Sequence, residues 1–413
     1  MNSWPTLYCP PLSPAINLKP LIVSTIYGER NFAPFQNARM YVCGITPYDA
    51  THLGHAATYL TFDLINRYLR ASGTSVTFVE NITDIDDPLL ERATRDDLKW
   101  QDLAASQIDL YRSDMTALRV LPPDSFVPAT AVMDLVSTAI SVMQANGFVY
   151  LVDSDLYFDI SSFLSELPIP LDTALTIFAD RGGDPDRAGK RHPLDPILWQ
   201  ANKPGEPGWD SIHGYGRPGW HIECAVIASR FLNGEDFINA SFGQTLIELQ
   251  GGGSDLIFPH HFMSAAQSKA LTGKPFAFAY VHAGMVGLDG EKMSKSKGNL
   301  VFVSKLLAQG VDQMVIRYAL LNSHYSADRM WGDEILPLAV SDIANLRESL
   351  SREIVAPTNE VITKIADCLS NDLNTPAALE ILREWHRETQ NGVVGGSAGE
   401  LARALDSLLG LAL

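Results

Sequence analysis

The alternation of strand-like and helix-like segments near the N-terminus constrains this fold more than any other feature. Residues 38–44, ARMYVCG, are apolar and β-prone. Leu60, Leu64 and Tyr68 then recur at helical spacing until the ASG at 71–73 ends the helix. A second strand-like run, SVTFVENI, follows. This strand–helix–strand order predicts a parallel sheet with a nucleotide site at the carboxyl ends of its strands.

Later segments extend this pattern and interrupt it once. We expect a helix over 220–232, a strand and turn over 246–261 and another strand over 276–290. Residues 151–215 are rich in glycine and proline and show little helical periodicity, which indicates an insertion. Beyond about residue 330, apolar residues at three- and four-residue spacing predict a helical bundle.

Composition and charge limit the kinds of partner that this chain can bind. A net charge of −17 would repel a polyanion over most of the surface, and no basic run marks a local nucleic-acid site. No stretch approaches the ~18–20 apolar residues of a membrane span, and the N-terminus lacks a basic segment followed by an apolar run. We therefore expect a cytoplasmic protein without membrane contact. The four cysteines, Cys9, Cys43, Cys224 and Cys368, are too scattered for a disulfide framework, which favours metal ligation or catalysis for any that matter.

Two short motifs carry candidate chemistry. His52 and His55 lie where the first helix begins, and the unpaired N–H groups of such a terminus attract phosphate. Gly54 between them lets a ligand approach the backbone. Three lysines in GEKMSKSKGN (290–299) gather positive charge suited to departing pyrophosphate. Either motif alone is compatible with an ordinary loop, but together they favour nucleotide chemistry.

These motifs resemble the two signatures of class I aminoacyl-tRNA synthetases, and in detail those of the cysteinyl-tRNA synthetase group. The matching segments are YVCGITPYDATHLGHA (41–56), NITDIDD (81–87), GRPGWHIEC (216–224), GGGSDLIFPHH (251–261) and KMSKSKGN (292–299). The resemblance implies an α/β fold: a Rossmann-like catalytic core, an inserted domain and a C-terminal α-helical bundle. The expected parts are the catalytic halves 1–125 and 211–330, the inserted connective domain 126–210 and the bundle 331–413. ATP, with Mg²⁺, and L-cysteine would be substrates, and one zinc ion per chain is implied.

A zinc site is chemically reasonable. Cys43, Cys224 and a histidine of the 260–261 pair would supply two sulfurs and a nitrogen and leave a fourth tetrahedral position open. A substrate thiolate would bind there far better than a serine hydroxyl, with a discrimination of ~10⁴–10⁵-fold. Spacing alone does not separate this site from two buried core thiols, because no C-x-x-C pair is present. The resemblance assigns the ligand roles to Cys43, Cys224 and His260.

Some segments depart from the synthetase pattern. Synthetases of this group usually continue the double histidine as His-His-Glu-Asn-Glu and use the last glutamate as a further ligand. This chain reads HHFMS, with Ser264 at that position, so we expect three protein ligands. The segments CGITPYD, TDIDDPL and RGGDP instead resemble the mycothiol cysteine ligases, a family derived from the synthetases, although Asp180 replaces their usual glutamate. The short helical region after residue 330 also favours this family over a synthetase with a full anticodon-binding module.

The resemblance to these ligases implies a reaction. L-cysteine would be joined, through cysteinyl-AMP, to the amine of 1D-myo-inositol 2-amino-2-deoxy-α-D-glucopyranoside (GlcN-Ins) in mycothiol biosynthesis. The expected protein is a monomer without a nucleic-acid partner. The alternatives are a cysteinyl-tRNA synthetase and an inactive paralogue that senses zinc or adenylate, and the presence of both histidines and the lysine stretch argues against the inactive paralogue.

Residue roles follow from the matching positions. His52 and His55 are expected to contact ATP phosphates, and Lys292 and Lys295 to stabilise pyrophosphate. The positions matching contacts to cysteinyl-adenylate are Cys43, Gly44, Ile45, Thr46, Thr58, Asn81, Ile82, Thr83, Trp220, Gly253, Ser254, Asp255 and Val286. Trp220 could instead be an ordinary core aromatic. The acidic run Asp84, Asp86 and Asp87 offers either general-base candidates or a loop cap.

Overall fold

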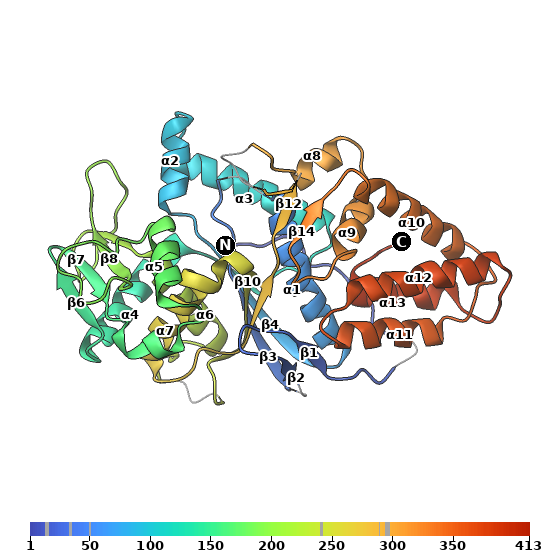
Figure 1. The fold of residues 1–413 in the computed structure, drawn as a ribbon, viewed down its shortest axis with the longest axis horizontal. Coiled ribbons are helices and arrows are strands. Elements are labelled where there is room, and N and C mark those ends of the chain that lie inside the picture. The colour runs from blue at the N-terminus through green and yellow to red at the C-terminus, as the bar shows by residue number, and fades with distance from the viewer. Residues whose placement is uncertain (13–15, 33–34, 49–50, 240–242, 289, 294–297) are drawn as a thin grey trace.

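A five-stranded parallel sheet forms the centre of the molecule (Figure 1). The computed structural model describes the chain from Met1 to Leu413 apart from residues 13–15, 33–34, 49–50, 240–242, 289 and 294–297. The sheet order is β11 (Ala277–Ala283), β10 (Ile247–Gly253), β3 (Asn37–Val42), β4 (Ser75–Ile82) and β5 (Ser125–Pro128). The chain runs outward from β3 to β5 and later returns on the other side of β3. This reversal opens a crevice at the carboxyl ends of β3 and β10, where α/β sheets bind ligands.

Helices cover both faces of this sheet, as the strand–helix–strand pattern predicts. Helix α1 (Leu53–Ala71) contacts β4 and β10, and α6 (Trp220–Asn233) contacts β3 and β4. Side chains alternate along β3, so Met40 and Val42 join the core on the α1 side while Tyr41 and Cys43 join the core that contains α6. Cys43 therefore faces α6. The expected strand 75–82 and helix 220–232 are confirmed as β4 and α6.

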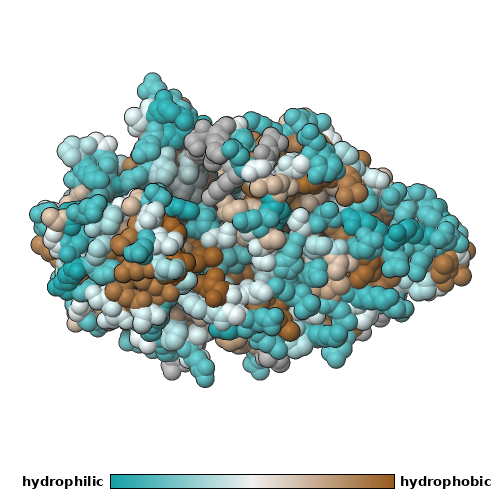
Figure 2. All heavy atoms as spheres, viewed as in Figure 1, coloured by the Kyte–Doolittle hydropathy of each residue, from teal (hydrophilic) through white to brown (hydrophobic). Residues whose placement is uncertain are grey.

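The helices after β14 (Arg329–Trp331) form the expected bundle against α1. They are α10 (Ile335–Leu350), α11 (Asn359–Ser370), α12 (Thr375–Gln390) and α13 (Ala398–Leu409), joined by α9 (Gln313–Leu321). Hydrophilic residues dominate the face of this bundle seen in Figure 2, whereas its apolar residues share a core with α1.

Buried charges tie the bundle to the central domain. The guanidinium of Arg67 on α1 lies 2.7 Å from Asp63 and donates to the Asp406 carbonyl on α13 at 2.7 Å. Arg317 on α9 also pairs with Asp63 and donates to the Leu409 carbonyl. Removing one partner would strand a buried charge at a cost of about 3–5 kcal/mol. The bundle is thus an integral part of the fold.

A second sheet lies beyond the α6 side of the core. It contains β6 (Val149–Val152), β7 (Asp155–Phe158), β8 (Ile197–Ala201) and β9 (Gly216–Pro218), all antiparallel. Helix α4 (Met133–Ala145) leads into it, and α5 (Leu171–Asp180) crosses within it. The expectation of little helical structure in 151–215 was wrong for α5. Only Ala174 and Phe178 are buried along this short helix, so its apolar period is too brief to read from sequence.

The segment expected as one strand over 276–290 divides between two sheets. After β11, β12 (Val286–Leu288) pairs with β13 (Glu291–Lys292) and β14 in a three-stranded sheet. The change occurs at Gly284, whose N–H donates to the Tyr325 carbonyl, and a Cβ there would lie 2.4 Å from the Ala327 carbonyl oxygen. A close backbone approach, and not hydrophobic period, ends the strand.

The remaining elements are peripheral to the sheet or connect it to the site. They are β1 (Leu21–Val23), β2 (Arg30–Phe32), α2 (Asp87–Arg95), α3 (Trp100–Ala117), α7 (Phe262–Thr272), α8 (Val303–Ala308), and the short turns η1 (Ala129–Val132), η2 (Ser161–Glu166), η3 (Ser254–Leu256) and η4 (Ile257–His261). Among the described residues no helix is both long and apolar enough to cross a bilayer.

Candidate active site

A cavity of about 530 Å³ occupies the crevice at the carboxyl ends of β3 and β10. Most residues predicted from the sequence line it: Cys43, Gly44, Ile45, Thr46, His52, His55, Thr58, Asn81, Thr83, Trp220, Cys224, Gly253, Asp255 and His260. Ile82 and Val286 are instead buried in the core beside it, and Ser254 lies between two lining residues. Lys295 lies outside the described residues. The predicted site residues thus converge on one cavity from five separate segments.

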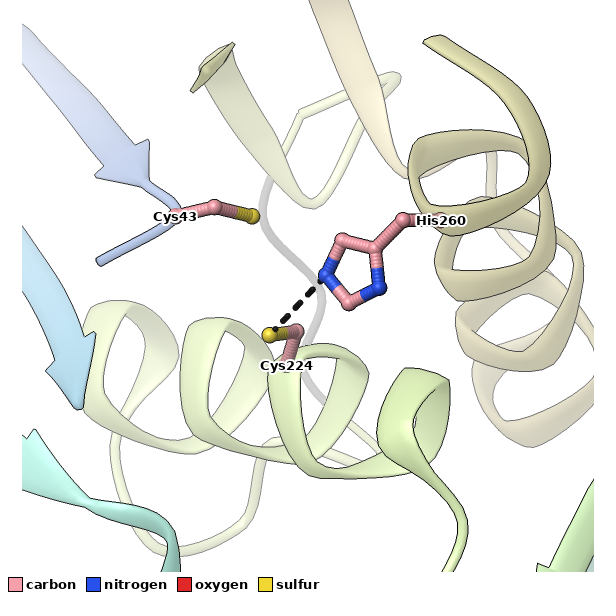
Figure 3. A group of neighbouring side chains, drawn as sticks. All are labelled: Cys43, Cys224 and His260. Carbon is pink, nitrogen blue, oxygen red and sulfur yellow. Dashed lines mark hydrogen bonds between the residues drawn. The ribbon is translucent and has the colours of Figure 1, made fainter. Parts of the chain in front are cut away.

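One end of the cavity, here called the sulfur end, consists of Cys43, Cys224, His260 and Trp220. The ligand atoms of the two cysteines and of His260 all lie within 4.8 Å of one another, and Figure 3 shows the three side chains pointing at a common centre. The Nε2 atom of His260 is 3.2 Å from the Cys224 sulfur. The Trp220 ring stacks on His260 with centroids 4.3 Å apart. Trp220 is therefore a wall of the cavity as well as a packing residue.

The backbone around β3 places the first of these sulfurs. Cys43 directly follows β3, and the next residue has no room for a side chain, since a Cβ on Gly44 would lie 1.6 Å from the Asn81 carbonyl oxygen. The Asn81 side-chain oxygen accepts from the Gly44 N–H and the Tyr41 hydroxyl, each at 2.9 Å. These bonds hold the ends of β3 and β4 together and keep Cys43 aimed at α6.

Three further histidines support the sulfur end. The Nδ1 atom of His221 lies 3.0 Å from Nδ1 of His260, so it can accept a hydrogen bond from the Nδ1–H of His260. With its proton on Nδ1, His260 has a free lone pair on Nε2 with which to bind a metal. His261 lies 3.3 Å from the Cys43 sulfur through Nε2 and 2.8 Å from His282 through Nδ1. Burial lowers the pKa of His221 and His261 well below its usual value, and that of His282 to about 4. All three rings are therefore neutral near pH 7.

Sequence reasoning did not find His221 and His282. His221 stands three residues before Cys224 on α6, which places both on one helix face and is the signal that could have found it. His282 gives no comparable signal, because only the pairing of β10 with β11 brings it beside His261.

The donor set at the sulfur end fits a zinc ion. Two sulfurs and one imidazole nitrogen form a soft, borderline set, and two Zn–S bonds of about 2.3 Å separate tetrahedral sulfurs by about 3.8 Å. Cys43, Cys224 and His260 are at most 5% exposed. Burial and the neighbouring Cys224 raise the pKa of Cys43, whereas a divalent cation between the sulfurs would favour thiolates. Ser264 donates to the His221 carbonyl at 3.2 Å, so its hydroxyl is already engaged.

The opposite end, here called the helix end, consists of His52, His55 and Thr58 at the start of α1. His52 caps the helix, because its Nδ1 atom accepts from the Gly54 N–H at 3.1 Å, and the proton of the ring is therefore on Nε2. The two imidazoles stack with centroids 3.8 Å apart. Burial lowers the pKa of His55 to about 4, and its Nδ1 atom has no hydrogen-bond partner among the residues that the structure describes. Two imidazoles at a helix N-terminus offer donors to an anion.

The lysine-bearing stretch begins and ends at this cavity. Lys292 closes β13, which pairs with β12, and Met293 and Leu300 line the cavity. Just beyond, the Leu53 N–H donates to the Val301 carbonyl, and the Val303 N–H donates to the Thr51 carbonyl. Backbone hydrogen bonds therefore join the start of α1 to the residues that follow the lysine motif.

The acidic run after β4 makes structural contacts. Asp84 accepts from the backbone and side chain of Thr130, and Asp86 caps α2 by accepting from the Asp87 N–H. Asp87 pairs with Arg217. None of the three lines the cavity. These bonds favour the loop-cap interpretation over the general-base interpretation.

Several lining residues were not among the site residues predicted from the sequence. They are Tyr48, Tyr59, Leu256, Gly284, Met285, Met293 and Leu300. Tyr59 follows Thr58 on α1, and its hydroxyl donates to the Cys43 carbonyl at 3.3 Å. Its position on the cavity-facing side of a predicted helix is the only signal that could have found it.

Comparisons with known proteins define the class. The family of tRNA synthetases class I (C) catalytic domains matches residues 31–341. The fold resembles Mycobacterium tuberculosis methionyl-tRNA synthetase in complex with methionyl-adenylate, with a TM-score of 0.64 over 91% of this chain and 88% of that chain at 17% identity. The expected α/β class I synthetase-like fold is thereby confirmed.

Relatives that are more similar in sequence identify a narrower family within this class. Proteins named L-cysteine:1D-myo-inositol 2-amino-2-deoxy-alpha-D-glucopyranoside ligase are 50% identical in Nakamurella multipartita and 47% identical in Gordonia bronchialis, each over 100% of both chains. The Kribbella flavida protein of that name is 52% identical over 91% of this chain and 90% of its own. The chain therefore belongs to this ligase family within the class I synthetase superfamily, as the sequence motifs predict.

Proposed function

We propose that this protein uses ATP to join L-cysteine to the amine of GlcN-Ins, through cysteinyl-AMP, as a step of mycothiol biosynthesis. One observation carries the proposal: a single cavity has a Cys–Cys–His cluster at one end and a capped helix N-terminus with two stacked histidines at the other. The full-length similarity to ligases of this name supports the choice of acceptor.

The sulfur end would select the amino acid. Cys43, Cys224 and His260 would hold one Zn²⁺, which when bound supplies an open coordination position that favours a thiolate over a hydroxyl. His221 would keep His260 in the tautomer that binds through Nε2. Trp220, stacked on His260, would exclude water from the side chain of the substrate.

The helix end would carry the first step. An oxygen of the cysteine carboxylate attacks the α-phosphorus of ATP, the bond from that phosphorus to the bridging oxygen breaks, and pyrophosphate leaves. His52 and His55 would donate to phosphate oxygens at the start of α1. Lys292 and Lys295 would neutralise the charge that develops on pyrophosphate, with Mg²⁺ as the ATP counterion. The remaining predicted adenylate contacts line or adjoin the cavity between these ends.

In the second step the amine nitrogen of GlcN-Ins attacks the activated carbonyl carbon, the bond to the phosphate oxygen breaks, and AMP leaves. One proton is lost from nitrogen as the amide forms. We propose that the enzyme acts as a cytoplasmic monomer on small molecules without a nucleic-acid partner. We retain the division at residues 125, 210 and 330 as a proposal for its domains.

The test is a side-by-side assay with ATP and cysteine in which the acceptor is either GlcN-Ins or total tRNA. AMP release and product mass are followed. Amide formed with GlcN-Ins and no charged tRNA is the expected result. Cysteinyl-tRNA formed at comparable efficiency would assign the chain to the cysteinyl-tRNA synthetases instead.

A further inference from the structure

One contact joins the inserted sheet region to the cavity. Arg181, which ends α5, reaches across to Asp255 of η3, with Nη1 3.8 Å from the carboxylate oxygen. Asp255 lines the cavity, and both side chains are about one-third exposed, at 32% and 34%. The pair therefore lies where the cavity meets solvent.

The turn that carries Arg181 is held rigidly. Gly183 packs against Phe178 so closely that a Cβ would lie 2.4 Å from its ring. Asp184 accepts from the Tyr157 hydroxyl and from Lys190, whose ammonium lies 2.9 Å away. This turn is the RGGDP segment, and nothing in the adenylation chemistry accounts for it. A fixed turn that delivers one guanidinium to a cavity mouth indicates recognition of a ligand there.

The distance between the pair leaves capacity for a ligand. At 3.8 Å the guanidinium and carboxylate are too far apart for a direct hydrogen bond. Among the described residues, Asp255 is the one side-chain partner of the Arg181 guanidinium, which has five N–H donors. A hydroxyl group could accept from the remaining N–H donors of Arg181, as sugar and polyol hydroxyls do.

The geometry of the cavity indicates which substrate reaches this pair. Cys43, Cys224 and His260 at the sulfur end are at most 5% exposed, and the helix end is the proposed phosphate site. The partly exposed side that carries Arg181 and Asp255 is therefore left for the acceptor. A guanidinium repels an ammonium, so it suits the hydroxyl-bearing end of an amino sugar and not its amine. We propose that Arg181, held by Asp255, binds hydroxyl groups of the acceptor and is a specificity-determining residue for the second step. This inference rests on the proposed function.

The test separates the two steps in the full-length zinc-loaded enzyme. Arg181→Ala should raise the KM for GlcN-Ins by roughly 10- to 100-fold, the scale of a lost hydrogen bond to a charged group. Cysteine-dependent ATP–pyrophosphate exchange, which needs no acceptor, should stay within about twofold of the wild type. Arg181→Lys, which keeps the charge but loses the planar set of guanidinium donors, should give an intermediate KM.

Arg191→Ala is the matched control, because Arg191 lies in the same inserted region and pairs with Asp159. It should change neither step. Exchange that falls in parallel with ligation in Arg181→Ala would overturn the inference and make Arg181 a support for the adenylate site. An unchanged KM would also overturn it. A wild type that ignores GlcN-Ins would instead overturn the proposed function.

Discussion

At the sulfur end of the cavity the proposed functional atoms belong to side chains buried in the core, whereas at the helix end they belong to residues at the start of α1. Cys43 and Cys224 are at most 5% exposed, and each has a histidine nitrogen within 3.3 Å of its sulfur. The helix end depends on the cap of α1 and on backbone bonds to Val301 and Val303. The end proposed to distinguish thiol from hydroxyl is therefore preformed, whereas the end proposed to bind phosphate depends on backbone contacts between the start of α1 and residues 301–303.

If this contrast is correct, the largest loss should come from the sulfur end. We expect Cys224→Ala to lose its zinc and to reduce cysteine-dependent ATP–pyrophosphate exchange by ~10³-fold or more. Loss of a residue that only supports a metal ligand typically costs about 10–100-fold, and loss of a ligand should cost more. Elemental analysis and the exchange assay check this. Cys368→Ala, a half-buried cysteine on α11, is the control and should retain both. Full exchange in a metal-free Cys224→Ala preparation would contradict a role for the metal in cysteine activation.

The lysines test the opposite end. Alanine at Lys292 or Lys295 should slow exchange by roughly 10²–10³-fold, because each removes one preorganised charge from departing pyrophosphate. Pyrophosphate is absent from the second step, so both variants should still transfer cysteine from preformed cysteinyl-AMP. Lys305→Ala on α8 serves as the control, since its ammonium lies over the Phe302 ring. Equal losses in both steps would assign the stretch a structural role.

Within the sulfur end, a residue that orients a metal ligand should have a smaller effect than the ligand itself. We expect His221→Ala to weaken zinc affinity by about 10–100-fold, because it removes the acceptor that orients His260. Competition with a chelator measures this, and added zinc should restore exchange. His386→Ala in the bundle, where the ring bonds Ser349, is a histidine control. Unchanged affinity in His221→Ala would mean that His260 is oriented by packing alone.

The smallest effect concerns stability at the helix end. Burial lowers the pKa of His55 to about 4, against about 6.5 for an ordinary histidine. The unfolded chain then binds more protons between these values, so stability rises with pH through this window and is fully present above about pH 6.5. Between pH 8 and pH 5.5 the wild type should lose about 1 kcal/mol more than His55→Gln. Denaturant titrations at both pH values measure it, and parallel losses would contradict the burial of His55.

The two ends also differ in how far the sequence predicts them. Cys43 and His52 follow from local pattern, since one ends an apolar strand and the other begins a helix. His221 shares a helix face with Cys224, a signal that sequence reasoning overlooked. His282 could not be predicted, because its role depends on a long-range contact with His261 that no periodicity records. The same limit explains the segment 276–290, where a backbone contact at Gly284 moves the chain from one sheet to another. Helix α5 was missed because only two of its residues are buried.

The most direct test of the central claim, that the sulfur end recognises the thiol of the substrate, replaces zinc by cobalt(II) and records the sulfur-to-cobalt charge-transfer absorption. Two protein thiolates give a basal band. Adding L-cysteine should increase this band, because a third sulfur occupies the open position, whereas L-serine at the same concentration should leave it unchanged. A band that does not respond to cysteine, or that responds equally to serine, would contradict thiol recognition by Cys43, Cys224 and His260.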